Sequence, residues 1–268
     1  ARGEGGGRLM KISETVHFDW YKNLFVVLVL VACVVASATV TDADFAEVIQ
    51  GGPQVTAFLE RFMQPDFSYI PTLIDPMIRT IKMSVLGTVI GFAVAVPLAF
   101  LATTVVTRNQ VVTAIFRFIL DVVRTIPNLL LAALTVAIVG IGEFSGVITI
   151  AVFTLGVVSQ LIFETIETVD EGPIEAAEAV GATRVQIAFW SIAPQVMSQL
   201  ASYLFYAFEI NVRASTVLGY VGAGGIGVIL NSSLGLLRYD RVSVIILMIF
   251  VVVAVVDFLS EAVRRRLA

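Results

Sequence analysis

The sequence predicts an all-α protein that crosses a membrane several times. Of its 268 residues, 58% are hydrophobic and only 14% are charged, and the mean hydropathy is +0.94. Soluble domains carry about 25% charged residues, so this composition is typical of a membrane protein. Most of the apolar stretches are uniformly apolar. This favours helices over the strands of a membrane barrel, in which apolar and polar residues alternate.

Composition also excludes several classes of function. A single cysteine, Cys33, and a single histidine, His17, cannot form a disulfide or a structural zinc site. The net charge is −4, from 17 basic and 21 acidic residues, which leaves no basic surplus for binding nucleic acid. The sequence contains no G-x-x-x-x-G-K-[ST] pattern, so it has no P-loop for ATP. We expect no metal or cofactor in this chain, and membrane lipid rather than nucleic acid around it.

Charge-free runs locate the candidate spans. About 20 apolar residues cross the hydrocarbon core of a bilayer, and a charge at its centre is costly. Seven runs contain no Asp, Glu, Lys or Arg: residues 23–41, 83–107, 125–142, 144–163, 185–208, 214–237 and 242–256.

The sixth run differs from the others in its glycine content. Gly219, Gly222, Gly224, Gly225 and Gly227 fall within nine residues, and glycine is a poor helix former. Membranes tolerate irregular backbone where protein or a water-filled cavity covers it. We therefore predict a broken or re-entrant segment here and six full spans in the chain. Gly222, Gly224, Gly225 and Gly227 are candidates for the translocation path or for gating.

Six spans place both termini on one side of the membrane. Cytoplasmic termini put most of the basic residues on the inner side, including the cluster at 264–266, as the positive-inside rule requires. The predicted organisation is a cytoplasmic segment at 1–22, a first span with an acidic external loop at 23–79, and a transmembrane domain at 80–268.

The longest predicted inner loop, at 164–194, contains helix boundaries. Gly172 and Pro173 suit the start of a short helix, and Gly181 is placed to end it in a left-handed conformation. Thr183 stands three residues before a glutamine, which is typical of a capping box that starts a second helix. A short amphipathic helix at the inner membrane surface can dock into a groove of a partner protein.

The same loop contains a recognisable pattern. Glu175, Ala176 and Ala177 are followed four residues later by Gly181, and Pro194 lies thirteen residues beyond that glycine. This spacing resembles the loop of the permease subunits of binding-protein-dependent ABC importers, which reads EAA, three residues, glycine, and later a hydrophobic residue and Leu-Pro. The resemblance implies that these five residues couple the permease to its ATPase.

The loop departs from the pattern at two positions: Ser191 and Ala193 stand where the pattern prefers Ile and Leu. Segments outside the loop point to one family among these permeases. Three stretches are similar to the phosphonate ABC transporter permease family: RTIPNLLLA from Arg124, ETIETVDEGPIEA from Glu164 and FEINVRASTVLGYVGAGGIG from Phe208. The similarity covers roughly residues 80–268.

This resemblance implies a type I ABC importer permease fold and a non-catalytic role in the bacterial inner membrane. The expected partners are a second copy of the chain, a dimer of ATPase subunits that use ATP and magnesium, and a periplasmic or lipid-anchored substrate-binding protein. The expected substrate is a small anion, phosphonate or a related phosphorus oxyanion such as phosphate or phosphite, carried by alternating access.

A charged pair near the end of the fifth run is a candidate for the translocation path. Glu209 and Arg213 lie four residues apart with Asn211 between them, and the acid precedes the base, as helical ion pairs prefer. Ionisable groups at membrane depth are costly without a partner and mark functional sites. Two interpretations stay open: a structural ion pair, or a contact between Arg213 and the passing anion.

Two rival functions use the glycine-rich segment. Residues 222–227 satisfy G-x-G-x-x-G, but no alternation of strands and helices surrounds them, so we reject a dinucleotide site. A gradient-driven secondary transporter would use a broken helix as its substrate site. That function does not explain the EAA pattern of the inner loop.

Overall fold

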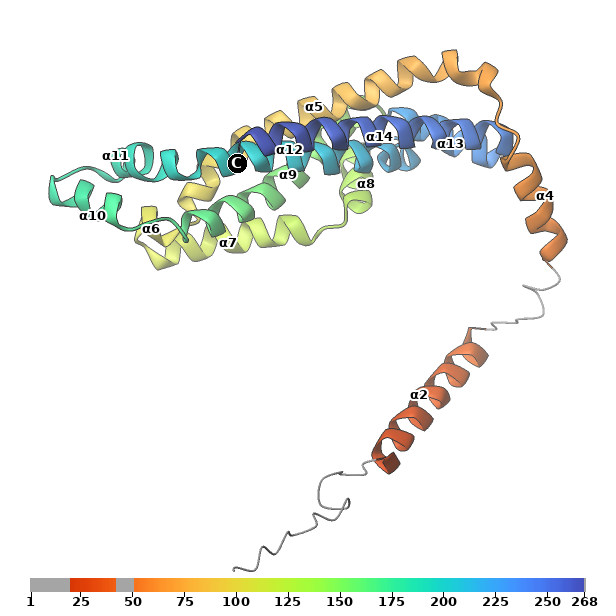
Figure 1. Cartoon of the computed structure of the whole chain (residues 1–268), viewed down its shortest axis with the longest axis horizontal. Coiled ribbons are helices and arrows are strands. Elements are labelled where there is room, and N and C mark those ends of the chain that lie inside the picture. The colour runs from red at the N-terminus through yellow and green to blue at the C-terminus, as the bar shows by residue number, and fades with distance from the viewer. Residues whose placement is uncertain (1–19, 42–50, 268) are drawn as a thin grey trace, which may run out of the picture. The chain divides into compact units, whose positions relative to one another are not determined.

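The computed structural model describes residues 20–41 and 51–267, and every regular element within them is a helix (Figure 1). The predicted all-α class is confirmed. The chain divides into two compact units, Ala1–Ala57 and Phe58–Ala268, with the boundary inside α4 (Gly52–Phe62). Most of the predicted cytoplasmic segment and part of the predicted external loop lie outside the described residues.

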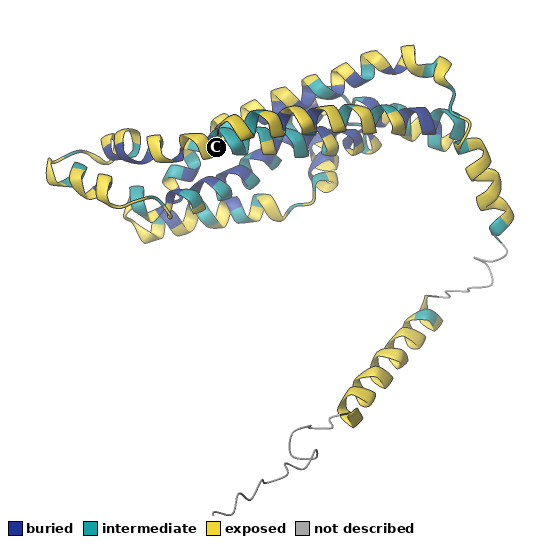
Figure 2. Cartoon of the chain, viewed as in Figure 1, coloured by how far each residue is buried: buried dark blue, intermediate teal, exposed yellow. Residues whose placement is uncertain are grey.

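The first unit contains α2, Trp20–Val40, which is the predicted first span. Its 21 residues are long and apolar enough to cross a membrane. In Figure 2 nearly all of this helix is coloured as exposed. Cys33 is one of its exposed residues. Such an apolar exterior is what a helix surrounded by lipid requires.

The second unit contains the remaining spans. Three of its elements are long and apolar enough to cross a membrane: η1 (Phe67–Tyr69) continuing into α5 (Ile70–Leu101), α9 (Glu143–Ile166) and α14 (Tyr239–Leu267). Two bent pairs also qualify: α7 (Gln110–Thr125) with α8 (Asn128–Val139), and Arg184–Val221 with α13 (Ile226–Gly235). The described residues thus have four helices that can each span a membrane, or up to six spans when each bent pair counts as one. The predicted six is the upper end of this range.

Short elements connect these spans. They are α6 (Thr104–Thr107), α10 (Gly172–Ala179), α11 (Arg184–Ile187), the π-helix η2 (Ala188–Ile192) and the 3₁₀-helix η3 (Gly219–Val221). α11 and η2 lead without a loop into the long α12 (Ala193–Leu218).

The third predicted span is bent rather than straight. α7 ends at Thr125, α8 begins at Asn128, and the two helices are bent by 93°. Pro127 has no N–H to donate, and it drives Ile126 into an extended conformation with φ −74° and ψ 122°. The predicted third span, residues 125–142, therefore contains only α8 as a complete helix, and α7 supplies the rest of the bent pair.

The glycine-rich break begins later in the chain than the charge-free runs indicate. α12 continues past the fifth run to Leu218, so Glu209 and Arg213 lie inside this helix rather than at its end. Opposite charges one turn apart support a helix and give it no reason to stop. The break is confined to residues 219–225, and the sixth predicted run starts with the last turn of α12.

The core of the second unit is built around α9. A β-carbon on Gly87 or Gly91 of α5 would overlap Ile150 or Ala151 of α9, so the two helices approach closely through these glycines. Figure 2 shows buried residues along α9. In the 18-residue apolar stretch of each helix, 56% is buried in α9 and 22% in α14. The core therefore continues along α9 to the inner loop that follows it.

Candidate coupling site and translocation site

The inner loop forms the helix, glycine turn and second helix that its sequence predicts. α10 begins at Gly172, whose N–H donates to the Asp170 carboxylate at 3.1 Å. It ends at a Schellman motif, in which the N–H of Gly181 donates to the Glu178 carbonyl at 2.9 Å and the next N–H donates to the Ala177 carbonyl at 3.0 Å. Gly181 has φ +81°, so the predicted left-handed turn is confirmed.

The second helix starts at the predicted capping box. The Thr183 side chain accepts from the Gln186 N–H, and the Gln186 side chain accepts from the Thr183 N–H at 2.8 Å. The helix then widens into η2, where the N–H of Ala193 donates to the Ala188 carbonyl, five residues back. Pro194 follows directly and has no N–H to donate, and such a π-type turn lets the chain continue into α12 despite it.

Polar side chains clamp the two ends of this loop together. Ser191 is buried, and its hydroxyl donates to the Pro173 carbonyl at 3.1 Å. The Gln195 amide accepts from the Asp170 N–H at 3.0 Å and donates to the Asp170 carbonyl at 3.3 Å. One departure from the loop pattern, the serine at 191, thus makes a hydrogen bond that isoleucine cannot make.

The EAA residues divide between partner-facing and core-facing positions. Glu175 and Ala176 are exposed, whereas Ala177 is half-buried and packs with the buried Ile174 against the core. Pro194 is exposed. α10 is therefore anchored by one apolar face and presents the other, with its carboxylate, to the outside.

Glu178 is a junction that the sequence pattern did not reveal. Its carboxylate accepts from Arg108, at the turn between α6 and α7, and from Arg184 at 2.9 Å. The hydrogen bonds from Arg108 and then Arg184 hold the pKa of the Glu178 carboxyl below its ordinary value. Seventy residues separate Arg108 from Glu178, and no local spacing signals such a pair.

A cavity of about 270 Å³ lies beside this junction. The residues that line it come from α6 and the turn after it, from the end of α9 and the segment that follows, and from α10. They are Val105, Arg108, Ile166, Glu167, Val169, Glu171, Ile174, Glu175 and Glu178, four of which are glutamates. Part of α10 thus borders this cavity and is not packed against another helix there.

The candidate charged pair is part of a larger network between α12 and α14. Glu209 accepts from Arg213 and from Arg264, the latter at 2.8 Å, and Arg213 also contacts Asp257 at 3.2 Å. Two carboxylates and two guanidiniums balance in charge. The sequence pattern does not pair Asp257 and Arg264 with this site, although their spacing of seven residues places them on one face of α14.

Asn211 lies away from that network, on another face of α12. It is 1% exposed, and its amide nitrogen donates to Thr88 of α5 at 2.8 Å and to Thr154 of α9 at 2.7 Å. The structure thus separates Asn211 from Glu209 and Arg213 and uses it to join three spans.

The four candidate glycines lie in the break and at the start of α13. Gly222, Gly224 and Gly225 have φ between +73° and +86°, conformations that suit glycine. Gly227 packs so closely against α12 that a β-carbon there would overlap the Thr216 carbonyl. The N–H of the adjacent Ile226 donates to the Thr80 hydroxyl at 2.8 Å, which fixes this turn to α5.

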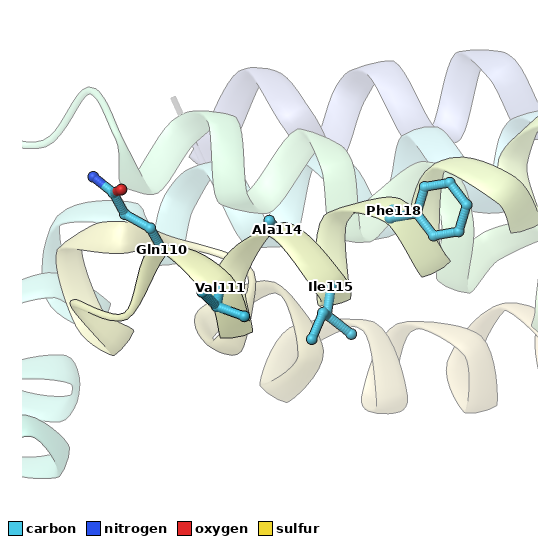
Figure 3. Close-up of a pocket in the computed structure, with 5 residues that line it drawn as sticks. All are labelled: Gln110, Val111, Ala114, Ile115 and Phe118. Carbon is cyan, nitrogen blue, oxygen red and sulfur yellow. The ribbon is translucent and has the colours of Figure 1, made fainter.

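A second cavity, of about 440 Å³, lies on α7 (Figure 3). All five side chains that line it belong to this one helix: Gln110, Val111, Ala114, Ile115 and Phe118. It contains no charged group that could bind an anion.

Comparison with known proteins gives a consistent result. The family model described as "Binding-protein-dependent transport system inner membrane component" matches residues 95–268. The phosphite transport system permease protein PtxC of Stutzerimonas stutzeri is 36% identical over 247 residues, 92% of this chain and 90% of that protein. The phosphate-import permease protein PhnE of Mycolicibacterium smegmatis is 34% identical over 86% of this chain and 43% of its own.

A third relative and a solved structure extend the comparison. The putative cryptic phosphonate transport system permease protein PhnE2 of Escherichia coli is 40% identical over 114 residues, 42% of this chain and 93% of that protein. An inward-facing structure of the MetNI methionine ABC transporter aligns with a TM-score of 0.65, at 21% identity, over 76% of this chain and 99% of that one. This likeness shows the fold.

Proposed function

This chain belongs to the family of binding-protein-dependent transport system inner membrane components, and we propose that it carries a phosphorus oxyanion inward. It is a multi-pass permease subunit of an ABC importer and a translocation component rather than an enzyme. ATP hydrolysis takes place in a separate ATPase subunit.

The substrate class rests on one observation. Permeases whose names give phosphite, phosphate or phosphonate are 33–40% identical to this chain. Permeases named for carnitine and D-methionine are only 25% and 26% identical. Phosphite, phosphate and phosphonate share a tetrahedral phosphorus centre with charged oxygens, and that shared chemistry defines the proposed substrate.

The proposed mechanism is alternating access without covalent chemistry. A substrate-binding protein delivers the anion at the outer mouth, and an ATPase dimer below the membrane receives α10 of each of two permease copies. Closure of the ATPases moves α10 and shifts the permease from inward-facing to outward-facing. Glu175, Ala176 and Pro194, which are exposed, are the residues proposed to touch the ATPase, and Ala177 and Gly181 shape the helix that carries them.

The charge network supports weak binding of the anion within the permease. Arg213 contacts two carboxylates, Glu209 and Asp257, so little of its charge is left for a passing anion. We therefore assign Glu209 and Arg213 a structural role and place the selection of substrate in the binding protein. Weak binding along the path is also what rapid release requires.

Reconstitution tests this function. The permease, its ATPase and its binding protein would be placed in proteoliposomes and supplied with phosphite, phosphate, methylphosphonate or methionine. We expect ATP-dependent uptake of at least one phosphorus oxyanion, only with the binding protein present, and none of methionine. Uptake that follows an imposed ion gradient without ATP would support the secondary transporter instead.

A further inference from the structure

The coupling helix α10 is tied firmly to α12. The hydroxyl of Ser191 reaches the Pro173 carbonyl at 3.1 Å, and the Gln195 amide holds the Asp170 backbone at 3.0 and 3.3 Å. Ile174 is buried in the core beside them. A displacement of α10 therefore carries the start of α12 with it.

The contact of α10 with α7 is of a different kind. The 270 Å³ cavity borders α10 and the turn between α6 and α7. Beside that space, the Glu178 carboxylate binds the Arg108 guanidinium. The hydrogen bonds from Arg108 and Arg184 lower the pKa of the Glu178 carboxyl, as expected for a carboxylate held by two cations. This ion pair joins α10 directly to the segment that leads into α7.

Arg108 sits where it can act directly on α7. It has φ +48°, a strained conformation for a non-glycine residue, and it directly precedes Asn109. The Asn109 side chain caps α7 by accepting from the Val111 N–H at 3.0 Å. A force on Arg108 thus reaches the first turn of α7 through the two intervening backbone residues.

Farther along α7, Arg117 provides a fixed point. Its guanidinium donates to the Ala102 carbonyl at the end of α5 at 2.8 Å and binds Glu167 at the end of α9. α7 is therefore attached to the two most closely packed spans near its middle and to α10 at its start. Such an arrangement converts movement at the start of the helix into rotation about Arg117.

The far end of α7 leads through the 93° bend into α8. Ala132 of α8 belongs to the same buried apolar cluster as Leu218 of α12 and Ala223 of the glycine-rich turn, and α8 contacts both α12 and η3. The elements α10, α7 and α8 thus form a continuous series of contacts from the inner loop to the break in the sixth run.

We propose that Arg108 is a positioning residue through which α10 moves α7, so that ATPase closure reaches the glycine-rich turn by way of α8. The inference rests on the proposed role of α10 as the coupling helix. Double-mutant measurements test such a series of contacts directly.

The first test uses the complete importer in proteoliposomes and measures anion imported per ATP hydrolysed. Arg108→Gln should lower this ratio about two- to fivefold, the range for loss of an exposed ion pair. Arg184→Gln removes the other cation from the same carboxylate but leaves α10 joined to α7, so its effect should be smaller. Arg265→Gln breaks a remote exposed pair with Glu261 and should match the wild type.

Exchange of the charges separates a pairing role from simple damage to the fold. The double variant Arg108→Glu with Glu178→Arg should recover part of the ratio that either single change loses. An unchanged ratio in Arg108→Gln, an equal loss in Arg184→Gln, or no recovery in the exchange would each overturn the inference.

A second measurement does not depend on the substrate. Hydrogen exchange of the permease–ATPase complex would be compared with and without a non-hydrolysable ATP analogue. In the wild type, both residues 172–182 and residues 110–125 should change protection; in Arg108→Gln, only the first segment should. If the wild type imports no phosphorus oxyanion but shows this pattern, the proposed substrate fails and the inference stands. If 110–125 still responds in Arg108→Gln, the inference fails.

Discussion

Gln195 holds the backbone of Asp170 by both of its hydrogen-bonding groups. The side-chain oxygen accepts from the Asp170 N–H at 3.0 Å, and the side-chain nitrogen donates to the Asp170 carbonyl at 3.3 Å. One amide thus pairs with another amide across 25 residues, in the manner of neighbouring strands. Since the Asp170 carboxylate in turn accepts from the Gly172 N–H at the start of α10, the orientation of the coupling helix depends on a side chain of α12.

Gln195→Leu removes both hydrogen bonds to Asp170, together with one from the side-chain nitrogen to the Ser191 carbonyl at 2.8 Å, while keeping a similar volume. We expect the inner loop to lose about 1–3 kcal/mol of local stability from the two bonds to Asp170, at about 0.5–1.5 kcal/mol each. Hydrogen exchange of residues 170–182 would measure the loss. Gln195→Glu, which keeps the acceptor and loses the donor, should fall between, and Gln199→Leu one turn along α12 is the control. Equal protection in all variants would show that the clamp is not needed.

Gly181→Val should uncouple ATP hydrolysis from transport. Nothing lies within 4 Å of the place that a β-carbon would take on Gly181, so steric exclusion is not the reason. The reason is φ +81°, which costs a side-chain-bearing residue about 1–2 kcal/mol and a β-branched one more. Gly181→Asn, whose side chain tolerates this conformation, should couple better than Gly181→Val. Similar coupling in both variants would argue against a conformational role for this glycine.

The structure of the inner loop can be predicted from the sequence because its signals are local. Its contacts with residues far away in the sequence cannot. Gly181 and the capping box of Thr183 use hydrogen bonds within five residues, which a sequence displays directly. Pro127 is the sequence signal for the bend, because a proline interrupts a helix, but the apolar run around it continues without a charge. Arg108 and Glu178 meet only because the segments that contain them fold together. Neither segment contains a sequence signal that indicates the other as its partner.

The translocation site shows the same limit. The spacing of Glu209 and Arg213 suits an ion pair, one of the two interpretations that the sequence leaves open, but nothing in it indicates Arg264, 55 residues from Glu209. Asn211, two residues from each member of the pair, was grouped with them by sequence although it points into the core. Positions two apart lie on different faces of a helix, so helical periodicity predicts that Asn211 lies away from the charged pair.

The orientation of the termini stays a prediction that labelling can check. With Cys33 replaced, a cysteine introduced next to Arg265 should react with a membrane-impermeant reagent only after the cells are opened, because the basic cluster at 264–266 favours the cytoplasmic side. A cysteine in the predicted external loop, at Ser68, should react in intact cells. Labelling near Arg265 from outside would reverse the topology.

Gly219→Ala should impair folding, whereas Gly235→Ala should not. A β-carbon on Gly219 would overlap the backbone of Gly227 and Val228, which cannot move aside as a side chain can, while nothing lies within 4 Å of a β-carbon on Gly235. Alanine is also the better helix former, so the second change should be neutral or favourable by up to about 1 kcal/mol. The yield of monodisperse permease in detergent would measure both. Equal yields would show that η3 and α13 do not need this close approach.

Glu209→Ala should harm the permease more than Arg213→Ala. Removing Arg213 leaves Glu209 paired with Arg264, but removing Glu209 takes a partner from both arginines at once. Glu209 is also the more enclosed side chain, 14% exposed against 49% for Arg213, so the charges around it are less screened by solvent. We expect a loss of about 1–3 kcal/mol for Glu209→Ala and partial recovery in the double variant with Arg213→Ala, measured by thermal stability of the purified protein. Strictly additive effects would show that the two side chains do not act together. Normal stability but poor uptake in Arg213→Ala, without recovery in the double variant, would instead assign Arg213 to the anion.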